Sequence, residues 1–302
     1  MSAPNTAFIK QYNNTIYLLA QQMDSRLRSS VVVDTNWTGE QKFYDQYNQD
    51  SMVEIESRYA DTPVQLPDFR RRMVQPRYFV SSTLEDPKDA LQMVIDPKST
   101  FMQAKVAAGN RQWDDLIIAA MGGTAYTGKT GSTSVTLASY VGVTGSAGSQ
   151  LIAYNYPSSS ANTGMSKAKV IEAKILLDKA EVEKTDRYMV HGASQLGDLL
   201  NTTEVVSSDY NVIKALVQGE ISTWLGFSWI HSERLLTNAS SYRLCYAYQR
   251  WAVQLAIQKD IEGRIDERVD KNMAWQVYLR MCGGSTRLEE ARIVQIPCVE
   301  TY

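Results

Sequence analysis

The spacing of hydrophobic residues changes along the chain. Within the first thirty residues, hydrophobic side chains recur every three or four positions. This spacing predicts an amphipathic helix of about five turns. An isolated helix of that length is marginal in water, so it should lie on another surface. That surface is either the chain's own core or, for an N-terminal arm, the chain and its neighbouring subunits. The apolar positions are Phe8, Tyr12, Ile16, Leu19, Met23 and Leu27.

Residues 50 to 84 alternate between apolar and charged positions instead. Val53, Ile55 and Tyr59 alternate with glutamate and arginine, and a second extended run covers residues 69–80 after a proline-rich stretch at 63–67. Alternation of this kind predicts β-strands, and the prolines predict the tip of a long hairpin. A two-stranded ribbon is marginal by itself, so the hairpin should also need a partner surface.

A long helix is predicted from Asp96 to about Met121, where the Gly122–Gly123 pair ends it. Its expected buried face is marked by Val106, Trp113, Ile117 and Ala120. From Gly122 to Gly164 the composition shifts to glycine, serine and threonine, with short strands expected near residues 133–137. A disordered linker is the alternative, but the apolar residues at 140–154 favour a packed connector.

The second half predicts a mixed α/β region that begins with a helix at residues 166–179. Opposite charges interleave from Asp260 to Lys271, which suits cross-strand and inter-subunit ion pairs. The other expected elements are strands at 187–191, 227–231, 242–248, 261–269, 275–281 and 292–299, a helical turn at 194–200, a segment at 212–221, and either helix or strand at 251–258.

Composition limits the function classes. The 302 residues are 44% hydrophobic and 21% charged with a net charge of −2, so the chain lacks the basic excess of a dedicated nucleic-acid binder. Three widely separated cysteines fit reduced thiols. Neither a signal peptide nor a long apolar span is present in the sequence, so synthesis in the cytoplasm is expected.

One stretch matches a nucleotide-binding motif letter by letter. Residues Gly123 to Thr130 satisfy G-x-x-x-x-G-K-[ST], the pattern of the phosphate-binding P-loop. That chemistry requires a strand before the loop and a helix after it, whose N-terminal amides face the phosphates. Here a predicted helix enters and strand-like sequence leaves, and no apolar strand ends in an aspartate for Mg²⁺. The match is therefore interpreted as fortuitous.

Other candidates for catalysis are weak, and no cofactor or metal is expected. Residues 192–197 approach a nucleophile elbow but place the second glycine one position late. His191 and His231 are the only histidines and are interpreted as structural. The Arg70–Arg71–Arg72 triplet could contact nucleic acid, but salt bridges to an acidic neighbour suit the near-neutral background better.

A series of motifs resembles the major capsid proteins of tailed double-stranded-DNA phages, which share the shell fold known as HK97. The series spans roughly residues 8 to 300 in the family's order. It consists of Asp96-Pro97-Lys98-Ser99, Asn110-Arg111 with Asp114-Asp115 and residues 117–120, Gly123-Thr124-Ala125 with Thr127-Gly128, Ser208-Asp209-Tyr210, Gly219-Glu220-Ile221, Gly226-Phe227, Ser232-Glu233-Arg234-Leu235, Arg264-Ile265 with Glu267-Arg268 and Asp270-Lys271, and Gly284-Ser285-Thr286-Arg287.

The resemblance implies an α+β, HK97-like fold. The expected parts are an N-terminal arm at residues 1–50, an extended β-hairpin (E-loop) at 51–95, and a peripheral domain at 96–164 with a long spine helix and a connector. An axial α/β domain at 165–258 and C-terminal strands at 259–302, returning to the peripheral domain, complete it. The candidate inter-subunit contacts are Phe8, Tyr12, Ile16, Arg70, Arg71, Arg72, Arg264, Glu267, Arg268, Asp270 and Lys271.

The implied function is a structural, non-enzymatic coat that self-assembles into an icosahedral head around double-stranded DNA. Its implied partners are its own copies in pentamers, hexamers and a closed shell, a separate scaffolding protein, a portal protein, a decoration protein and packaged DNA held by non-specific contact, with no membrane. It would be assembled in the host cytoplasm and reside in the virion. An encapsulin-like nanocompartment shell is the alternative within this fold, and a P-loop nucleotide hydrolase is the distant alternative outside it.

Overall fold

The computed structural model describes residues 19–35, 37–48, 50–59, 61, 62, 64, 66, 68–86, 98–142, 145–157, 162–200 and 223–300. The expected segments at 8–18 and 212–221, including Phe8, Tyr12 and Ile16, lie outside these residues. The chain divides into two compact units. The first combines Met1–Asp24, Tyr78–Gln112 and Lys259–Cys282, and the second combines Ser25–Arg77, Trp113–Gln258 and Gly283–Tyr302.

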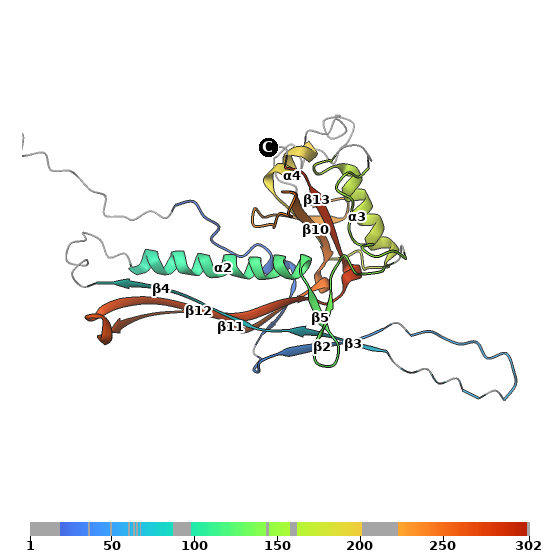
Figure 1. Ribbon diagram of the computed structural model, residues 1–302, viewed down its shortest axis with the longest axis horizontal. Helices are drawn as coiled ribbons and strands as arrows, with labels where there is room; N and C mark the ends of the chain where they lie inside the picture. The colour runs from blue at the N-terminus through green and yellow to red at the C-terminus, as the bar shows by residue number, and fades with distance from the viewer. Residues whose placement is uncertain are drawn as a thin grey trace, which may run out of the picture. The chain divides into compact units, whose positions relative to one another are not determined.

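The described elements are mixed helix and strand, and their strands form three sheets (Figure 1). The sheet orders are β1-β11-β12-β4, β13-β10-β7-β9-β8 and β2-β3-β5-β6. The helices are α2 (Lys98–Gly122), α3 (Lys167–Lys179) and α4 (Ala193–Leu200). The strands are β1 (Val32–Thr35), β2 (Lys42–Tyr47), β3 (Phe69–Val74), β4 (Arg77–Glu85), β5 (Ala125–Thr127), β6 (Thr133–Val135), β7 (Arg187–His191), β8 (Thr223–Trp224), β9 (Phe227–His231), β10 (Arg243–Gln249), β11 (Val253–Arg268), β12 (Ala274–Arg287) and β13 (Ile293–Cys298).

The five-stranded sheet and helix α3 form a buried core within the second unit. Strand β10 pairs antiparallel with β13 and β7, and β7 pairs parallel with β9. Ser166 caps α3, since its hydroxyl accepts from the Lys169 amide at 3.3 Å. Val170, Ala173 and Leu177 of α3 are fully buried. The predicted helix at 166–179 and the predicted strands at 187–191 and 227–231 are therefore confirmed.

The hairpin was predicted with the wrong first strand. Strand β3 pairs antiparallel with β2, so the partner strand is Lys42–Tyr47, whereas residues 51–59 form no strand. Their alternation is typical of a strand, but no ladder partner for them exists among the described residues. Figure 1 shows this segment between β2 and β3 extending away from its sheet.

The predicted N-terminal helix is wrong over its described part, because residues 19–27 are irregular. The Asp114 carboxylate explains the conformation of the end of this stretch. It accepts from the backbone amides of Arg26 and Leu27 at 3.0 and 3.1 Å and from the Ser25 hydroxyl at 2.5 Å. These amides thus find an acceptor 87 to 88 residues away, where a helix would offer a local carbonyl.

In the first unit, the N-terminal part of α2 packs against strand residues without room for larger side chains. A methyl group on Gly109 would lie 2.9 Å from Ile261 Cδ1, and one on Gly263 would lie 2.6 Å from Met102 Sδ. Val106, which was expected to be buried, is 37% exposed. No helix among the described residues is long and apolar enough to cross a membrane.

The rest of α2 and the C-terminal strands correct two further expectations. Trp113 and Ile117 are fully buried as predicted, whereas Ala120 is only half-buried. The stretches at 251–258 and 261–269, predicted as separate elements, form a short 3-10 turn followed by the single 16-residue strand β11. The second half of β11 is charged and exposed, so the pattern of apolar residues did not predict one continuous strand.

Candidate functional site

The arginine triplet lies on β3, and its side chains alternate between the two faces of the strand. Arg72 enters the core of its own chain, where Nη2 donates to Glu290 Oε2 at 2.5 Å and Nε donates to the Leu288 carbonyl at 2.9 Å. The two charged side chains are 5% and 4% exposed. Arg72 is therefore committed to its own subunit, and only Arg70 and Arg71 remain available to a neighbour.

Arg287 completes this buried network. Its guanidinium donates to Glu290 at 3.2 Å and to the carbonyls of Met121, Gly123 and Val135 at 2.8 to 3.0 Å. Burial lowers the pKa of Arg287, while the Glu290 carboxylate opposes the shift. These carbonyls belong to the end of α2, the residue after it and the end of β6. The network therefore holds the chain at the start of the stretch that matches the P-loop motif and at the strand that follows this stretch.

The stretch from Gly123 to Thr130 forms a β-hairpin rather than a phosphate-binding loop. It leaves the end of α2, runs through β5 and turns at Gly128–Thr130 toward β6. Gly128 has φ +94°, a left-handed conformation that favours glycine. The inverted order of helix, loop and strand is confirmed, and no helix N-terminus follows the loop to hold a phosphate.

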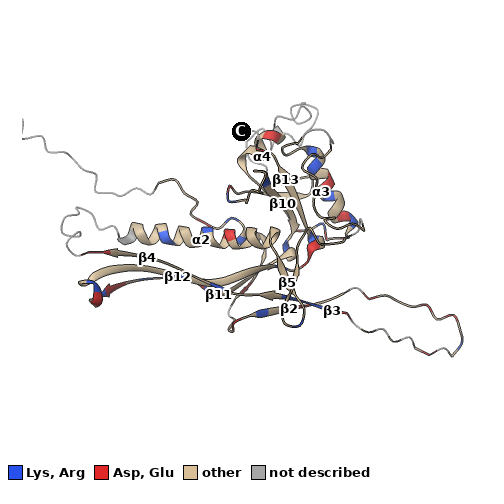
Figure 2. Cartoon of the chain, viewed as in Figure 1, with Lys and Arg blue, Asp and Glu red and all other residues tan. Residues whose placement is uncertain are grey.

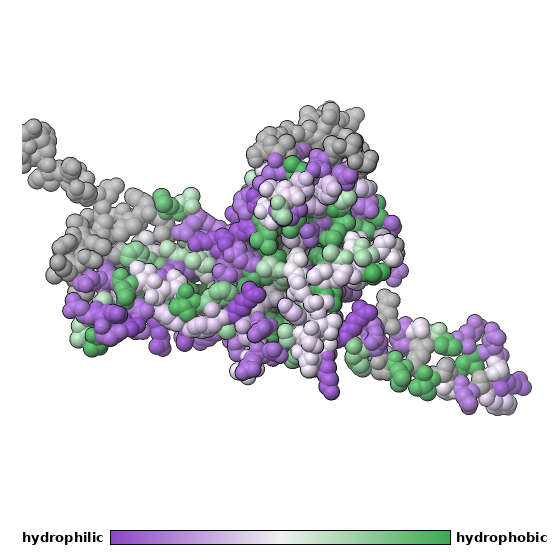
Figure 3. All heavy atoms as spheres, in the orientation of Figure 1, coloured by the Kyte–Doolittle hydropathy of each residue, from purple (hydrophilic) through white to green (hydrophobic). Residues whose placement is uncertain are grey.

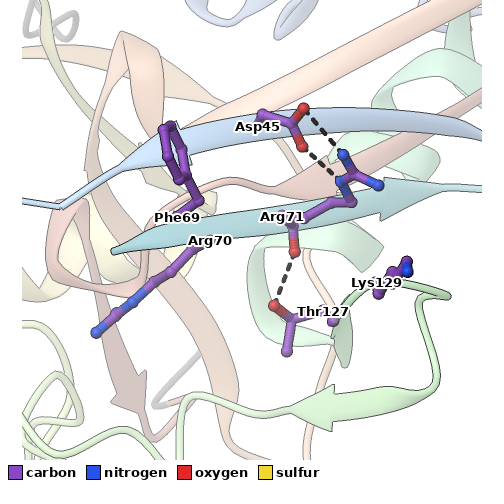
Figure 4. Close-up of a pocket in the computed structure, with 7 residues that line it drawn as sticks. Asp45, Phe69, Arg70, Arg71, Thr127 and Lys129 are labelled. Carbon is purple, nitrogen blue, oxygen red and sulfur yellow. Dashed lines mark hydrogen bonds and ion pairs between the residues drawn. The ribbon is translucent and has the colours of Figure 1, made fainter. Parts of the chain in front are cut away.

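A cleft of about 520 Å³ lies at the root of the β2–β3 hairpin, which here means the end of the paired strands where the connecting segment leaves them. Lys129 lines this cleft (Figure 4). Across the hairpin, Arg71 donates to both oxygens of Asp45 at 2.5 and 3.1 Å, which lowers the pKa of Asp45. The Arg71 guanidinium also stacks over Phe43 at 5.3 Å. The full lining is Asp45, Phe69, Arg70, Arg71, Thr127, Gly128 and Lys129.

The chemistry of this cleft is binding rather than catalysis. Its only carboxylate is already paired with Arg71, and none of its lining side chains is a histidine or cysteine. Within the described ranges, neither Arg70 nor Lys129 forms an ion pair, so the lining carries a cationic excess. An open, cationic cleft of this kind suits carboxylates or other anions of a partner.

The segment between β2 and β3 exposes apolar side chains that no other described part of the chain covers. Met52 and Tyr59 are fully exposed, and Leu66 is 89% exposed. Figure 3 shows green, hydrophobic residues interspersed with purple, hydrophilic ones along the segment that extends beyond the hairpin. Glu54 and Glu56 alternate with the apolar side chains, so the segment pairs an apolar pattern with negative charge. Its composition is complementary to the cationic cleft.

The turn between β11 and β12 carries the other predicted contacts. Arg268 is bound within the turn, where it donates to both oxygens of Asp270 at 2.7 and 2.6 Å. Arg264, Glu267 and Lys271 are exposed, and the described part of the chain offers them no ion pair. Figure 2 shows the alternating charges at this turn. The expected cross-strand pairing is confirmed at Arg280 and Glu262, 2.8 Å apart.

The two histidines lie side by side, which the sequence analysis missed. His191 and His231 end the parallel strands β7 and β9 in register, with ring centroids 5.7 Å apart. The only signal was that both predicted strands ended in histidine. His191 is buried, and burial lowers its pKa. No cluster of three or more potential metal ligands occurs in the residues with a described placement.

Comparisons with known proteins agree with this architecture. A family model described as phage capsid protein matches residues 5–300. No curated protein matches the chain. Among solved structures, the chain is similar to the capsid of cyanophage P-SCSP1u (TM-score 0.72, 15% identity, 98% of this chain and 94% of that chain). It is similar to the capsid of cyanophage Pam1 (0.73, 15%, 99% and 98%) and to that of a native GTA particle (0.73, 14%, 98% and 96%). At these identities the likenesses establish the fold.

Proposed function

Because the chain belongs to the phage capsid protein family, we propose that it forms the pentamers and hexamers of a phage head through its β2–β3 hairpin and the cleft at the root of that hairpin. It is a structural protein of the capsid and not an enzyme. A repeated head-to-tail contact closes into rings, and rings tile a shell through further contacts. Each contact can be weak because a closed cage links many of them.

The observation that carries the proposal is the uncovered apolar side of the segment between β2 and β3. A row of exposed apolar side chains such as Met52, Ile55, Tyr59 and Leu66 is costly in water and is typical of an interface. Burial of such side chains stabilises a complex by about 1.5–3 kcal/mol for each side chain buried in full. In an assembled shell, a neighbouring subunit would cover these apolar side chains.

The cleft offers a complementary anchor for the acidic positions of this segment. The free cationic groups are Arg70 and Lys129, and Arg71 keeps one guanidinium nitrogen outside its pair with Asp45. We place Glu54 or Glu56 of an adjacent subunit against these groups. A charge-assisted hydrogen bond at such a site fixes the alignment of the two subunits and also stabilises their contact.

The division into parts fits the same proposal. Strand β2 together with residues 51–95 would act as the E-loop, the chain before β2 as the arm, 96–164 and 259–302 as the peripheral domain, and 165–258 as the axial domain around five-fold and quasi-six-fold axes. A separate scaffolding protein, a portal protein and a decoration protein would complete the head. The net charge of −2 suits a container that touches packaged DNA without binding it tightly.

The test replaces two apolar residues of the segment and counts shells. The double variant Met52→Ser/Ile55→Ser, co-expressed with the scaffolding protein, should keep the wild-type melting temperature and yield fewer than about a tenth of the wild-type shells by negative-stain electron microscopy. Leu236→Ser is the matched control, since Leu236 is also exposed at 51% but lies outside the hairpin. Normal shell numbers from the double variant would overturn the proposed role of the segment.

A further inference from the structure

The two histidines differ in their access to protons. His191 is 3% exposed, and burial lowers its pKa, which favours the neutral ring. The His231 side chain is 41% exposed. Of the only two histidines in the chain, His231 is therefore the one whose ring is open to solvent.

His231 holds one group on each ring nitrogen. Arg26 Nη1 lies 2.7 Å from Nδ1 and 2.8 Å from the His231 carbonyl oxygen, while Nε2 lies 3.0 Å from Glu233 Oε1. A guanidinium can only donate, so Nδ1 must accept and carry no proton. A carboxylate accepts, so Nε2 carries the hydrogen. The geometry therefore requires the neutral ring with its proton on Nε2.

Arg26 belongs to a short strap, residues 25–30, that precedes β1 in the chain. At its start, the Asp114 carboxylate holds the Ser25 hydroxyl and the amides of Arg26 and Leu27. At its end, the Ser30 hydroxyl lies 2.5 Å from the hydroxyl of Tyr248. Between these contacts, Arg26 bonds the strap to the end of β9. The ring of His231 supplies one of its two acceptors there.

We propose that His231 is a proton-operated latch that holds the strap when the ring is neutral and loosens it when the ring is protonated. A proton on Nδ1 would point an N–H at the Arg26 guanidinium, which removes the acceptor and places two like charges in contact. Nε2 would keep its bond to Glu233. Protonation thus breaks the bond to the strap while the bond to the β9–β10 connection remains.

The surrounding charges allow this exchange. Glu233 faces the ring, and it also accepts from the Ala193 amide at the start of α4 and lies 3.5 Å from Arg243 of β10. His191 of β7 contributes no charge when neutral. The carboxylates of α2 are already engaged, Asp114 by the strap and Asp115 by Arg234. None of these is free to replace the ring as an acceptor for Arg26.

Hydrogen exchange on the full-length subunit tests the latch directly. Amide protection of residues 25–30, corrected for intrinsic exchange rates, should fall about tenfold between about pH 8 and about pH 5.5, since a bond to a charged group is lost. His231→Asn places an amide oxygen near the position of Nδ1 and should keep the protection at both pH values. Arg26→Gln should lower it at both.

The core provides the control, and the outcomes are separate from shell assembly. Protection of β13 must stay constant, because a parallel loss there would report global unfolding instead of release of the strap. Equal strap protection at both pH values in the wild type would overturn the latch. Persistence of the tenfold change in His231→Asn would do the same. Because unassembled subunits are measured, either outcome leaves the proposed shell contacts to their own test.

Discussion

The five-stranded sheet and the β2–β3 hairpin use apolar side chains in opposite ways. In the sheet, Tyr246, Ala247 and Tyr248 of β10 are fully buried, and Val294 and Ile296 of β13 are buried beside them. Beyond the hairpin, apolar side chains of the connecting segment are exposed by half or more. The apolar side chains of the sheet are buried within one subunit, whereas the segment beyond the hairpin has an apolar surface that no described residue of its own chain covers.

The change from buried to exposed side chains occurs along β3. Val74 and Arg72 are buried, Arg71 is half-buried, and Phe69 is 66% exposed. The buried end is fixed by Glu290 and Arg287, while at the exposed end Phe69 makes an edge-to-face contact with Tyr47 of the opposite strand. One strand therefore serves the core at one end and the candidate interface at the other.

The largest expected effect is at the buried end. Arg72→Ala should lower the free energy of unfolding by about 3–5 kcal/mol, because it leaves part of a buried ion pair without its partner. Arg70→Ala is the matched control on the same strand face, and its exposed side chain should change stability by no more than about 0.5 kcal/mol. Urea unfolding followed by circular dichroism measures both. Equal urea midpoints for the two variants would contradict the division of β3 into a buried end and an exposed end.

Elements with strong local signals were predicted well from the sequence. The helix α3 carries its cap at Ser166 and its apolar positions at helical spacing, and strands β7 and β9 are short apolar runs between turn residues. The misplaced elements depended on distant partners. The strap takes its acceptor from Asp114, and β3 pairs with a strand whose pattern had been overlooked at residues 42–47.

The candidate site shows the same limit. The arginine triplet and the lysine of the P-loop-like motif were visible in the sequence, but the sequence could not show that Arg70, Arg71 and Lys129 share one cleft. Nor could it show that Arg72 turns inward, since its partner Glu290 is 218 residues away. Side chains alternate between the two faces of a strand, so three consecutive arginines cannot all point the same way, but which of them is buried depends on tertiary packing.

At the exposed end, the expected effect is on assembly and not on folding. Arg71→Ala removes a solvent-exposed cross-strand pair with Asp45, so the melting temperature of the subunit should match that of the wild type. The cleft loses a cation, so co-expression with the scaffolding protein should give fewer closed shells by electron microscopy. Thr133→Ala, in strand β6 of the same sheet, is the control. A drop in melting temperature without a change in shell number would place Arg71 with the core.

The smallest effect is expected in the middle of the five-stranded sheet, at Tyr246. Its hydroxyl is buried without a hydrogen-bond partner among the described residues, and burial raises the pKa of Tyr246. Tyr246→Phe removes only this unsatisfied oxygen, so at neutral pH the free energy of unfolding should rise or stay within about 1 kcal/mol.

The raised pKa of Tyr246 gives this variant a pH signature. A phenol in the unfolded chain ionises near pH 10, while the buried phenol remains protonated to higher pH. Its contribution to stability is therefore complete below about pH 10 and is lost as the pH rises toward the folded pKa. The wild type should lose stability between about pH 9 and about pH 11 more steeply than Tyr246→Phe, in urea titrations at each pH. Because the lowered pKa of Lys169 acts in the opposite direction in both proteins, the difference between the two slopes isolates the tyrosine. Equal slopes would mean that this part of the sheet admits water, and the contrast with the hairpin would then be weaker than the burial of Tyr246 indicates.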